Sequence, residues 1–351
     1  MNKIILYGSY GYTGSLIAEM AAESEMHVLL SGRNAEKLQV QSEKLGLPHA
    51  KASLDMPDEL DALMNAGDVV LHCAGPYLHT WRAMAEACLR NRCHYLDITG
   101  EIDVFESLKK LDEIFKSRGI MAMPGVGFDV VPTDCLALYL SKKIDNPTHL
   151  ELAFVGLSGG ISRGTTKTMI ENMGEGGAVR KNGEIVSVPA AHRVKEVHFG
   201  NIKKRAVSIP WGDVSTAYTT TGIDNIIVYA ALPGNVIRSM KWSRWLAPIL
   251  RTGFVKKRMM KKADERAPGP GETARKKGRS LVWGQVKNES GEQAGALINT
   301  KEAYQLTAEM AFQISGMVLD GKYEPGYKTP AGFFGHELIM KIEGTEMSDM
   351  S

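Results

Sequence analysis

The sequence has 351 residues, of which 44% are hydrophobic and 23% are charged, and its formal net charge is +2. This length predicts two domains, and the composition is typical of a globular protein with a sizeable core rather than a disordered chain. No run reaches the ~18 consecutive apolar residues that cross a bilayer, and the N-terminus has no signal-like segment. The four cysteines form no C-x-x-C pair, so we expect free thiols, a cytoplasmic protein and no metal site.

The first predicted elements form a strand, a glycine-rich turn and a helix. Lys3–Tyr7 is a short apolar run, and Ser15–Glu23 has the pattern of an amphipathic helix. The turn between them is Gly8, Ser9, Tyr10, Gly11, Tyr12, Thr13 and Gly14. In such a unit the first glycine permits a tight turn, the second lets the backbone approach a pyrophosphate, and the third lets helix and strand pack closely. The spacing G-x-x-G-x-x-G therefore predicts a dinucleotide site, although an ordinary surface turn is the alternative.

The second predicted strand, His27–Ser31, bears on which dinucleotide binds. Enzymes that use NAD usually place an acidic residue here, about 20 residues past the glycines, to hold the ribose 2′-hydroxyl. This chain has Gly32, Arg33 and Asn34 instead. A guanidinium suits a 2′-phosphate through charge-assisted hydrogen bonds. We therefore predict NADP(H) rather than NAD, with an exposed arginine at the start of the helix Ala35–Leu45 as the alternative role of Arg33.

Further strands alternate with helices over the first 130 residues, which predicts an α/β fold with a doubly wound parallel sheet. Asp55 follows a short strand at 49–52 and is expected either at the adenine or as a helix cap. The apolar run Asp68–Cys73 leads into Ala74, Gly75 and Pro76, small and rigid residues suited to close approach of a ribose or nicotinamide. Predicted strands at 94–98 and 120–123 follow, with helices at 81–91 and 104–117 between and after them.

The pattern changes after a helix at 135–142. Predicted strands at 150–155, 184–188, 206–209 and 225–231 lack regular intervening helices, which favours a second, α+β domain with a mixed sheet. A β-hairpin is expected over 280–300 and helices over 304–319 and 333–342. The segment 236–262 is predicted to be a basic amphipathic helix. Residues 236–287 hold fifteen Lys and Arg against three acidic residues, an imbalance that can mark a partner surface.

Several stretches, in the same order along almost the whole chain, together resemble the saccharopine dehydrogenase-like oxidoreductases, especially the trans-acting enoyl reductases. The matching stretches are Gly8–Gly14, Gly32-Arg33, Cys73–Tyr77, Tyr95–Glu101, Pro124–Asp134, Ser158–Thr166, Gly212–Val228, Gly269–Trp283, Tyr304–Thr307 and Gly326–Gly335. The resemblance implies an NADP-binding Rossmann domain, a mixed α/β domain, and a C-terminal helix that returns to the Rossmann domain. We accordingly expect residues 1–133 and 326–351 in the Rossmann domain, and 134–325 in a domain for substrate binding and oligomerisation. Ser9-Tyr10 departs from the family's usual Ala-Thr, but the glycines are intact.

Hydride transfer needs the nicotinamide fixed against an acceptor, with a donor for the proton that follows. The candidate catalytic groups at the strand ends are Tyr77, Tyr95, Glu101 and Asp129. Structural alternatives are a pocket wall for Tyr77, a core ring with a satisfied hydroxyl for Tyr95 and a surface ion pair for Glu101. The nearby Asp97 and Asp134 could cap turns or helices.

The expected reaction is reduction of an unsaturated, enoyl-type substrate that is hydrophobic or linked to a carrier. The alternatives are a saccharopine-type imine reductase, for which Arg163 and Lys167 could bind a carboxylate, and an NADP(H) sensor without turnover. The basic segment 236–262 could dock an acidic carrier protein or bring the protein to a membrane surface, or it could be a core helix with a solvated edge. A homodimer is left open. Nucleic-acid binding is not expected, because no aromatic-interleaved basic motif is present.

Overall fold

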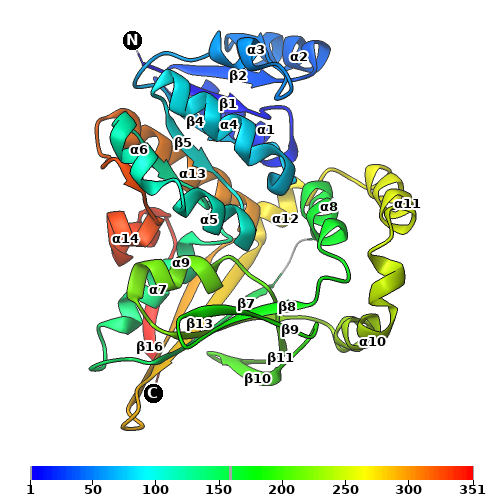
Figure 1. Ribbon diagram of the computed structural model, residues 1–351, viewed down its shortest axis with the longest axis vertical. Coiled ribbons are helices and arrows are strands. Elements are labelled where there is room, and N and C mark those ends of the chain that lie inside the picture. The colour runs from blue at the N-terminus through cyan, green and yellow to red at the C-terminus, as the bar shows by residue number, and fades with distance from the viewer. Residues whose placement is uncertain (1, 158–159, 351) are drawn as a thin grey trace. The chain divides into compact units, whose positions relative to one another are not determined.

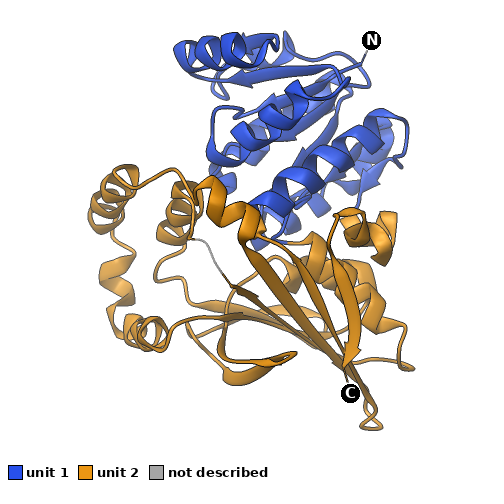
Figure 2. Cartoon of the chain, turned by 180° about the vertical axis from the view of Figure 1, so that it is seen from behind, with its two compact units in different colours: residues 1–129, 304–329 blue, residues 130–303, 330–351 orange. Residues whose placement is uncertain are grey.

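The computed structural model describes residues 2–157 and 160–350. The chain divides into two compact units (Figure 2). Unit 1 contains residues 1–129 and 304–329, and unit 2 contains residues 130–303 and 330–351. The predicted α/β class, a Rossmann domain with a second mixed-sheet domain, is confirmed.

Unit 1 is built on a parallel sheet of seven strands in the order β15-β6-β5-β4-β1-β2-β3. The strands are β1 (Ile4–Tyr7), β2 (Val28–Gly32), β3 (His49–Lys51), β4 (Val69–His72), β5 (His94–Asp97), β6 (Met121–Met123) and β15 (Gly326–Tyr327). All residues of the central strands β1, β4 and β5 are buried, as expected for strands covered on both faces. The strand order reverses between β1 and β4, and such a switch point is where open α/β sheets bind ligands.

Helices lie in front of this sheet and behind it (Figure 1). They are α1 (Tyr12–Ala22), α2 (Ala35–Leu45), α3 (Pro57–Asp61), α4 (Tyr77–Asn91), α5 (Ile102–Lys109), α6 (Asp112–Arg118) and α13 (Ala303–Leu319). The predicted helix 81–91 begins four residues earlier, at Tyr77, and the predicted helix 104–117 is two helices, α5 and α6.

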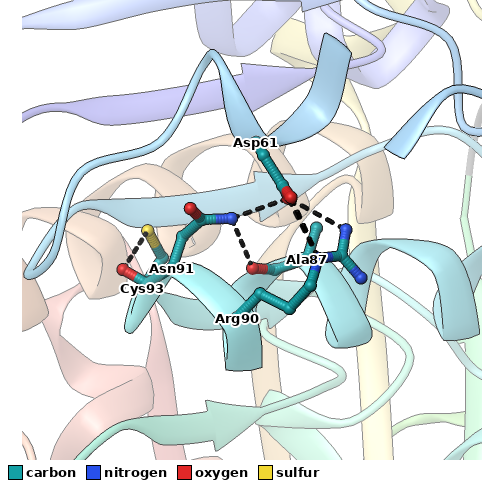
Figure 3. A network of polar contacts seen from close by, with 5 residues as sticks. All are labelled: Asp61, Ala87, Arg90, Asn91 and Cys93. Atoms are coloured by element: carbon teal, nitrogen blue, oxygen red, sulfur yellow. Dashed lines mark hydrogen bonds and ion pairs between the residues drawn. The ribbon is translucent and has the colours of Figure 1, made fainter. Parts of the chain in front are cut away.

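A polar network at the surface connects α3 to the C-terminal end of α4 (Figure 3). The Arg90 guanidinium donates to both carboxylate oxygens of Asp61 at 2.9–3.2 Å, and Asn91 Nδ2 donates to Asp61 Oδ1 at 2.7 Å. These bonds, above all those from Arg90, lower the pKa of Asp61. The ion pair is largely exposed, so we attribute to it the positioning of α3 rather than a large share of stability.

The chain returns to unit 1 at a different place from the predicted one. Residues 304–329 belong to unit 1, and residues 330–351 belong to unit 2. The helix α13 is predominantly apolar and buries ten residues, and β15 then pairs with β6 at the sheet edge. By contrast β16 (Glu346–Met350) pairs with β14 in unit 2. The predicted helix 333–342 is a short helix, α14 (Pro330–Phe334), followed by a 3-10 helix, η1 (His336–Lys341).

Unit 2 contains a mixed sheet of nine strands, in which β12 and β7 are parallel and the other neighbours are antiparallel. The strands are β7 (His149–Gly156), β8 (Gly177–Lys181), β9 (Glu184–Val188), β10 (Val194–Phe199), β11 (Ile202–Ser208), β12 (Asn225–Ala231), β13 (Arg279–Lys287), β14 (Gln293–Lys301) and β16. The helices are α7 (Val131–Ser141), α8 (Arg163–Glu171), α9 (Asp213–Thr221), α10 (Gly234–Leu250), α11 (Gly253–Asp264), α12 (Glu272–Lys277) and α14. The predicted single helix over 236–262 is two helices, α10 and α11. Ser158 and Gly159, within one of the matching stretches, lie outside the described residues.

Candidate active site

The turn from Gly8 to Gly14 connects β1 to α1 with the predicted geometry. Gly8 has φ +83°, a conformation that a residue with a Cβ rarely adopts. A Cβ on Gly14 would collide with the carbonyl oxygen of Gly8, so this glycine permits the close packing of helix on strand. Gly11 is the N-cap of α1, and no side chain caps this helix end. The first amides of α1 could therefore donate to an anion at the end of the sheet.

Ser9 and Tyr10 both contact the next βα unit. Ser9 is buried and exchanges hydrogen bonds with Gln41 of α2, through Ser9 Oγ to Gln41 Oε1 at 2.7 Å and Gln41 Nε2 to Ser9 O at 2.9 Å. Tyr10 covers Gly32, where a Cβ would lie 2.7 Å from its ring, and its hydroxyl accepts from Asn34 N at 3.1 Å. The residues that depart from the family's Ala-Thr thus connect the turn to β2 and α2.

The end of β2 presents Arg33 beside this tyrosine. Arg33 is exposed and, within the described residues, makes no ion pair or hydrogen bond. Asn34 is the N-cap of α2, and its Oδ1 accepts from Lys37 N at 2.9 Å. Asp55 is exposed in the turn before α3 and does not cap that helix, whose N-cap is Met56. Arg33 is therefore free to bind a 2′-phosphate at this edge.

The structure brings the Cys73–Pro76 turn against the glycine-rich turn. A Cβ on Gly8 would lie 2.9 Å from the carbonyl carbon of Cys73 and 3.0 Å from Cβ of Ala74. The Gly75–Pro76 peptide bond is cis, and Ala74 O accepts a hydrogen bond from Thr80 Oγ1 at 2.9 Å. Both turns therefore lie at the switch point between β1 and β4, as a dinucleotide site requires.

Tyr95 and Asp97 form a buried pair at the end of β5. Tyr95 Oη donates to Asp97 Oδ2 at 2.6 Å, while Asp97 Oδ1 accepts from Thr99 N and Gly125 N at 3.0 and 2.9 Å. Burial raises the pKa of Asp97 to about 6, although these three hydrogen bonds oppose the rise. Tyr95 is completely buried and its hydroxyl is engaged, so its contacts favour the structural alternative.

Glu101 caps the N-terminus of α4. Its two carboxylate oxygens accept from Tyr77 N and Leu78 N, both at 2.9 Å. Burial raises the pKa of Glu101, although these two backbone bonds oppose the rise. The bonds explain why α4 begins at Tyr77, before the apolar pattern from which it was predicted. The Tyr77 ring is buried edge-on to His72, with 5.4 Å between the ring centroids.

Asp129 is half-buried, like Glu101, but differs from Asp97 and Glu101 because it has no hydrogen-bond partner among the described residues. Its side chain lies over Gly100, where a Cβ would lie 2.7 Å from Asp129 Oδ2. Burial, and secondarily the charge of Glu101, raise the pKa of Asp129 to about 7. Burial raises the pKa of Tyr77, and the charges of Cys73, Asp97, Glu101 and Asp129 contribute to the same rise. A carboxyl group with this pKa can hold or release a proton near neutral pH.

Thr307 is a supporting residue that was not predicted individually. Its Oγ1 accepts from Phe128 N at 3.0 Å, and a Cβ on Gly127 would lie 2.6 Å from Thr307 Cγ2. Helix α13 thereby fixes the turn that carries Asp129. Thr307 lies in the matching stretch Tyr304–Thr307. Its supporting role depends on the contact with Phe128, which is far away in the sequence and could not be predicted from that stretch.

A family model matches the part of the chain that contains the glycine-rich turn and the strand ends up to β6. Residues 4–123 match the saccharopine dehydrogenase NADP binding domain, which covers the strand ends and turns described above from β1 to β6. This match covers about a third of the chain. The predicted resemblance to saccharopine dehydrogenase-like oxidoreductases and the predicted cofactor, NADP, are thus confirmed.

The relatives extend the similarity beyond this domain. A rat saccharopine dehydrogenase-like oxidoreductase is 27% identical over 204 residues, which are 51% of this chain and 48% of the relative. The trans-acting enoyl reductase of Mycobacterium leprae is 32% identical over 150 residues, which are 40% and 36% of the two chains. The chain thus spans about half the length, or less, of the curated relatives it matches.

Solved structures show the same fold over the whole chain. Saccharopine dehydrogenase (L-Glu forming) from Saccharomyces cerevisiae has a TM-score of 0.69 at 11% identity, and the match covers 100% of both chains. Homospermidine synthase from Legionella pneumophila, solved with NAD, has a TM-score of 0.66 at 9% identity and covers 99% of this chain and 91% of its own.

The residues at these turns offer the donors that NADP requires. The uncapped amides of α1 would hold the pyrophosphate, Arg33 the 2′-phosphate, and the Cys73–Pro76 turn would face the nicotinamide half.

Arg33→Ala is expected to raise the Kd for NADPH roughly 10–100-fold, the value of a charge-assisted hydrogen bond, and to leave the Kd for NADH nearly unchanged. Fluorescence titration with both cofactors measures the effect. Lys44→Ala is the matched control because it removes an exposed cation from the opposite end of α2. It should change neither the Kd for NADPH nor the Kd for NADH. Equal losses for the two cofactors in the Arg33 variant would contradict the 2′-phosphate role.

Tyr95→Phe tests whether the buried pair is structural. The variant removes one of three hydrogen bonds to the buried Asp97 carboxyl, so we expect unfolding free energy to fall by about 1–2 kcal/mol while kcat stays within roughly twofold. Urea denaturation and steady-state kinetics measure the two quantities. A large fall in kcat at unchanged stability would return Tyr95 to the catalytic residues.

Proposed function

We propose that this protein is an NADP(H)-dependent oxidoreductase that reduces the activated carbon–carbon double bond of a hydrophobic, enoyl-type substrate. The observation that carries the proposal is the Asp129 carboxyl group, which has a pKa near 7 and no hydrogen-bond partner within the described residues. Asp129 follows β6, the strand at which the matched NADP-binding residues 4–123 end. Reduction of such a bond needs one hydride and one proton, and Asp129 is suited to supply the proton.

NADPH, when bound, would supply the hydride to the carbon β to the carbonyl group of the substrate. The α carbon would then need a proton. In its acid form Asp129 donates that proton, becomes a carboxylate and recovers a proton from water. Glu101 stays bound to the amides of α4 and keeps a negative charge beside Asp129, which favours the protonated form of Asp129 at rest.

The contacts of two cations favour an enoyl substrate over the alternative of an imine between amino acids. An imine of that kind carries several carboxylates and needs cationic side chains to bind them. Arg163 Nη2 and Nε donate to Arg266 O at 2.6 and 3.2 Å, and Lys167 pairs with Asp264 at 2.6 Å. These two residues, the candidates for carboxylate binding, thus already have partners within unit 2.

The reaction is tested by following NADPH oxidation against medium- and long-chain enoyl thioesters, free and carrier-linked, and against imines of amino acids with keto acids. We expect turnover of the thioesters, with kcat/KM rising with chain length because the substrate is apolar. Turnover restricted to imines would replace this proposal with the saccharopine-type reaction. Tight NADPH binding without consumption of any acceptor would favour a sensor.

A further inference from the structure

Helix α10 is held on unit 2 by one face. Ile237 is buried in a cluster with Ala191 and Val207, and Met240 packs against the same cluster. One turn later, Arg244 Nε and Nη2 donate to the carbonyl oxygens of Ala190 and Ala191 at 2.7 and 2.8 Å. The helix is therefore docked by residues about one turn apart, and its other face is free of these contacts.

That other face is apolar and exposed. Trp242, Trp245, Leu246 and Ile249 have the spacing of a single helical stripe, and their exposed fractions are 71%, 84%, 49% and 57%. Phe254, in the first turn of α11, is 77% exposed. Two of the five tryptophans of the chain thus project into solvent from adjacent turns, whereas a surface tryptophan normally covers its ring on neighbouring side chains.

Cations surround this stripe. Residues 236–262 contain nine Lys and Arg and no acidic residue. Six of the nine are exposed and form no ion pair within the described residues: Arg238, Lys241, Lys257, Arg258, Lys261 and Lys262. These six and the five apolar side chains form what we call the α10–α11 surface, and Figure 1 shows the two helices following one another at the edge of unit 2.

We propose that the α10–α11 surface binds an anionic phospholipid bilayer, with α10 lying in the plane of the interface. Tryptophan is enriched at the level of the headgroups, where its apolar ring and its N–H group are both satisfied. Lys and Arg around an apolar stripe attract anionic lipid, and this combination is typical of helices that lie on a membrane. None of the helices that the structure describes could span a bilayer.

The shape of the surface favours a bilayer over an acidic protein. Protein interfaces place aromatic anchors in a partner's preformed pockets within a largely flat, closely packed patch. Here the tryptophans lie on an apolar stripe among cations, and their high exposure leaves them free to enter a fluid layer. The proposal does not depend on the reaction proposed above, because none of these residues belongs to unit 1.

The full chain is tested by co-sedimentation with vesicles of phosphatidylcholine alone and with roughly one third phosphatidylserine. We expect binding to the anionic vesicles, weakened by salt, together with a blue shift of tryptophan emission. Trp242→Ala combined with Trp245→Ala should weaken binding at least about tenfold, and Lys257→Gln with Arg258→Gln and Lys261→Gln should weaken it by a similar factor.

The matched control is Val40→Ser with Met56→Ser, which removes two apolar side chains of similar exposure from unit 1 and should leave vesicle binding unchanged. Circular dichroism and the thermal transition establish that each variant is folded. Absence of vesicle binding by the unsubstituted protein, or binding that the folded tryptophan variant retains, would overturn the proposal. Binding of an acidic acyl carrier protein through this surface without any vesicle binding would also overturn it.

Discussion

Asp129→Asn is expected to lower kcat for an enoyl substrate by roughly 10²–10⁴-fold, the usual contribution of a positioned general acid. Asparagine has nearly the same size, so the position over Gly100 and the Kd for NADPH should be retained. In the unsubstituted protein kcat should fall as pH rises through about 7, since Asp129 loses its proton there. The variant should lack this limb of the pH profile. Steady-state kinetics between pH 5 and 9 measure both effects, and a variant with unchanged kcat would exclude Asp129 as the proton donor.

The same substitution should lower kcat but raise the stability of the protein at pH 8. The pKa of Asp129 is raised in the folded protein from 3.8 to about 7, so the folded state binds the proton more tightly than the unfolded chain. The contribution of this group to stability is therefore fully present below about pH 4 and is lost as pH rises to about 7. At pH 5 the stability of Asp129→Asn should be close to that of the unsubstituted protein. At pH 8 the variant should be more stable than the unsubstituted protein. Thermal transitions at the two pH values measure this difference in stability. If Asp129 had a purely structural role, the variant would be less stable than the unsubstituted protein at pH 8.

The elements that were predicted well are those whose sequence pattern is local. The strands β1, β4 and β6 of unit 1 are short, buried, mainly apolar runs, and a glycine or proline follows each within three residues. Helix α9 shows the opposite case. Its sequence is rich in threonine, which has a low helix propensity, and no helix was predicted there. Five of its residues are buried, so tertiary packing determines the helix.

The site residues divide in the same way. The glycines of the first turn could be predicted because each is required by a local conformation or a close approach. The arrangement of the carboxyl groups could not, since all of them follow strands and the sequence does not say which one is capped. Glu101 binds the amides of α4, Asp97 binds Tyr95, and Asp129 alone of the three keeps a carboxyl group without a hydrogen-bond partner in the described part of the chain. Only the three-dimensional contacts distinguish a structural carboxylate from a candidate acid.

Gly11→Ala and Gly14→Ala should separate cofactor binding from folding within one turn. A Cβ on Gly14 would collide with the Gly8 carbonyl oxygen, which neither the strand nor the helix can move away, so we expect a loss of roughly 3 kcal/mol in unfolding free energy. Gly11 has φ −70° and ψ 169°, which alanine adopts readily, and its added Cβ would lie 3.1 Å from the same oxygen, a contact that a small shift relieves.

The Gly11 variant should therefore stay folded but lose affinity, because its methyl group occupies the approach of the pyrophosphate to the amides of α1. Loss of two phosphate hydrogen bonds, at about 1.5 kcal/mol each, corresponds to a roughly 100-fold higher Kd for both NADPH and NADH. Urea denaturation and cofactor titration of the two variants measure the two effects side by side. Arg33→Ala should raise the Kd for NADPH alone, whereas the Gly11 variant should raise the Kd for both cofactors. If the Gly11 variant raised the Kd for only one cofactor, the pyrophosphate would not bind at the start of α1.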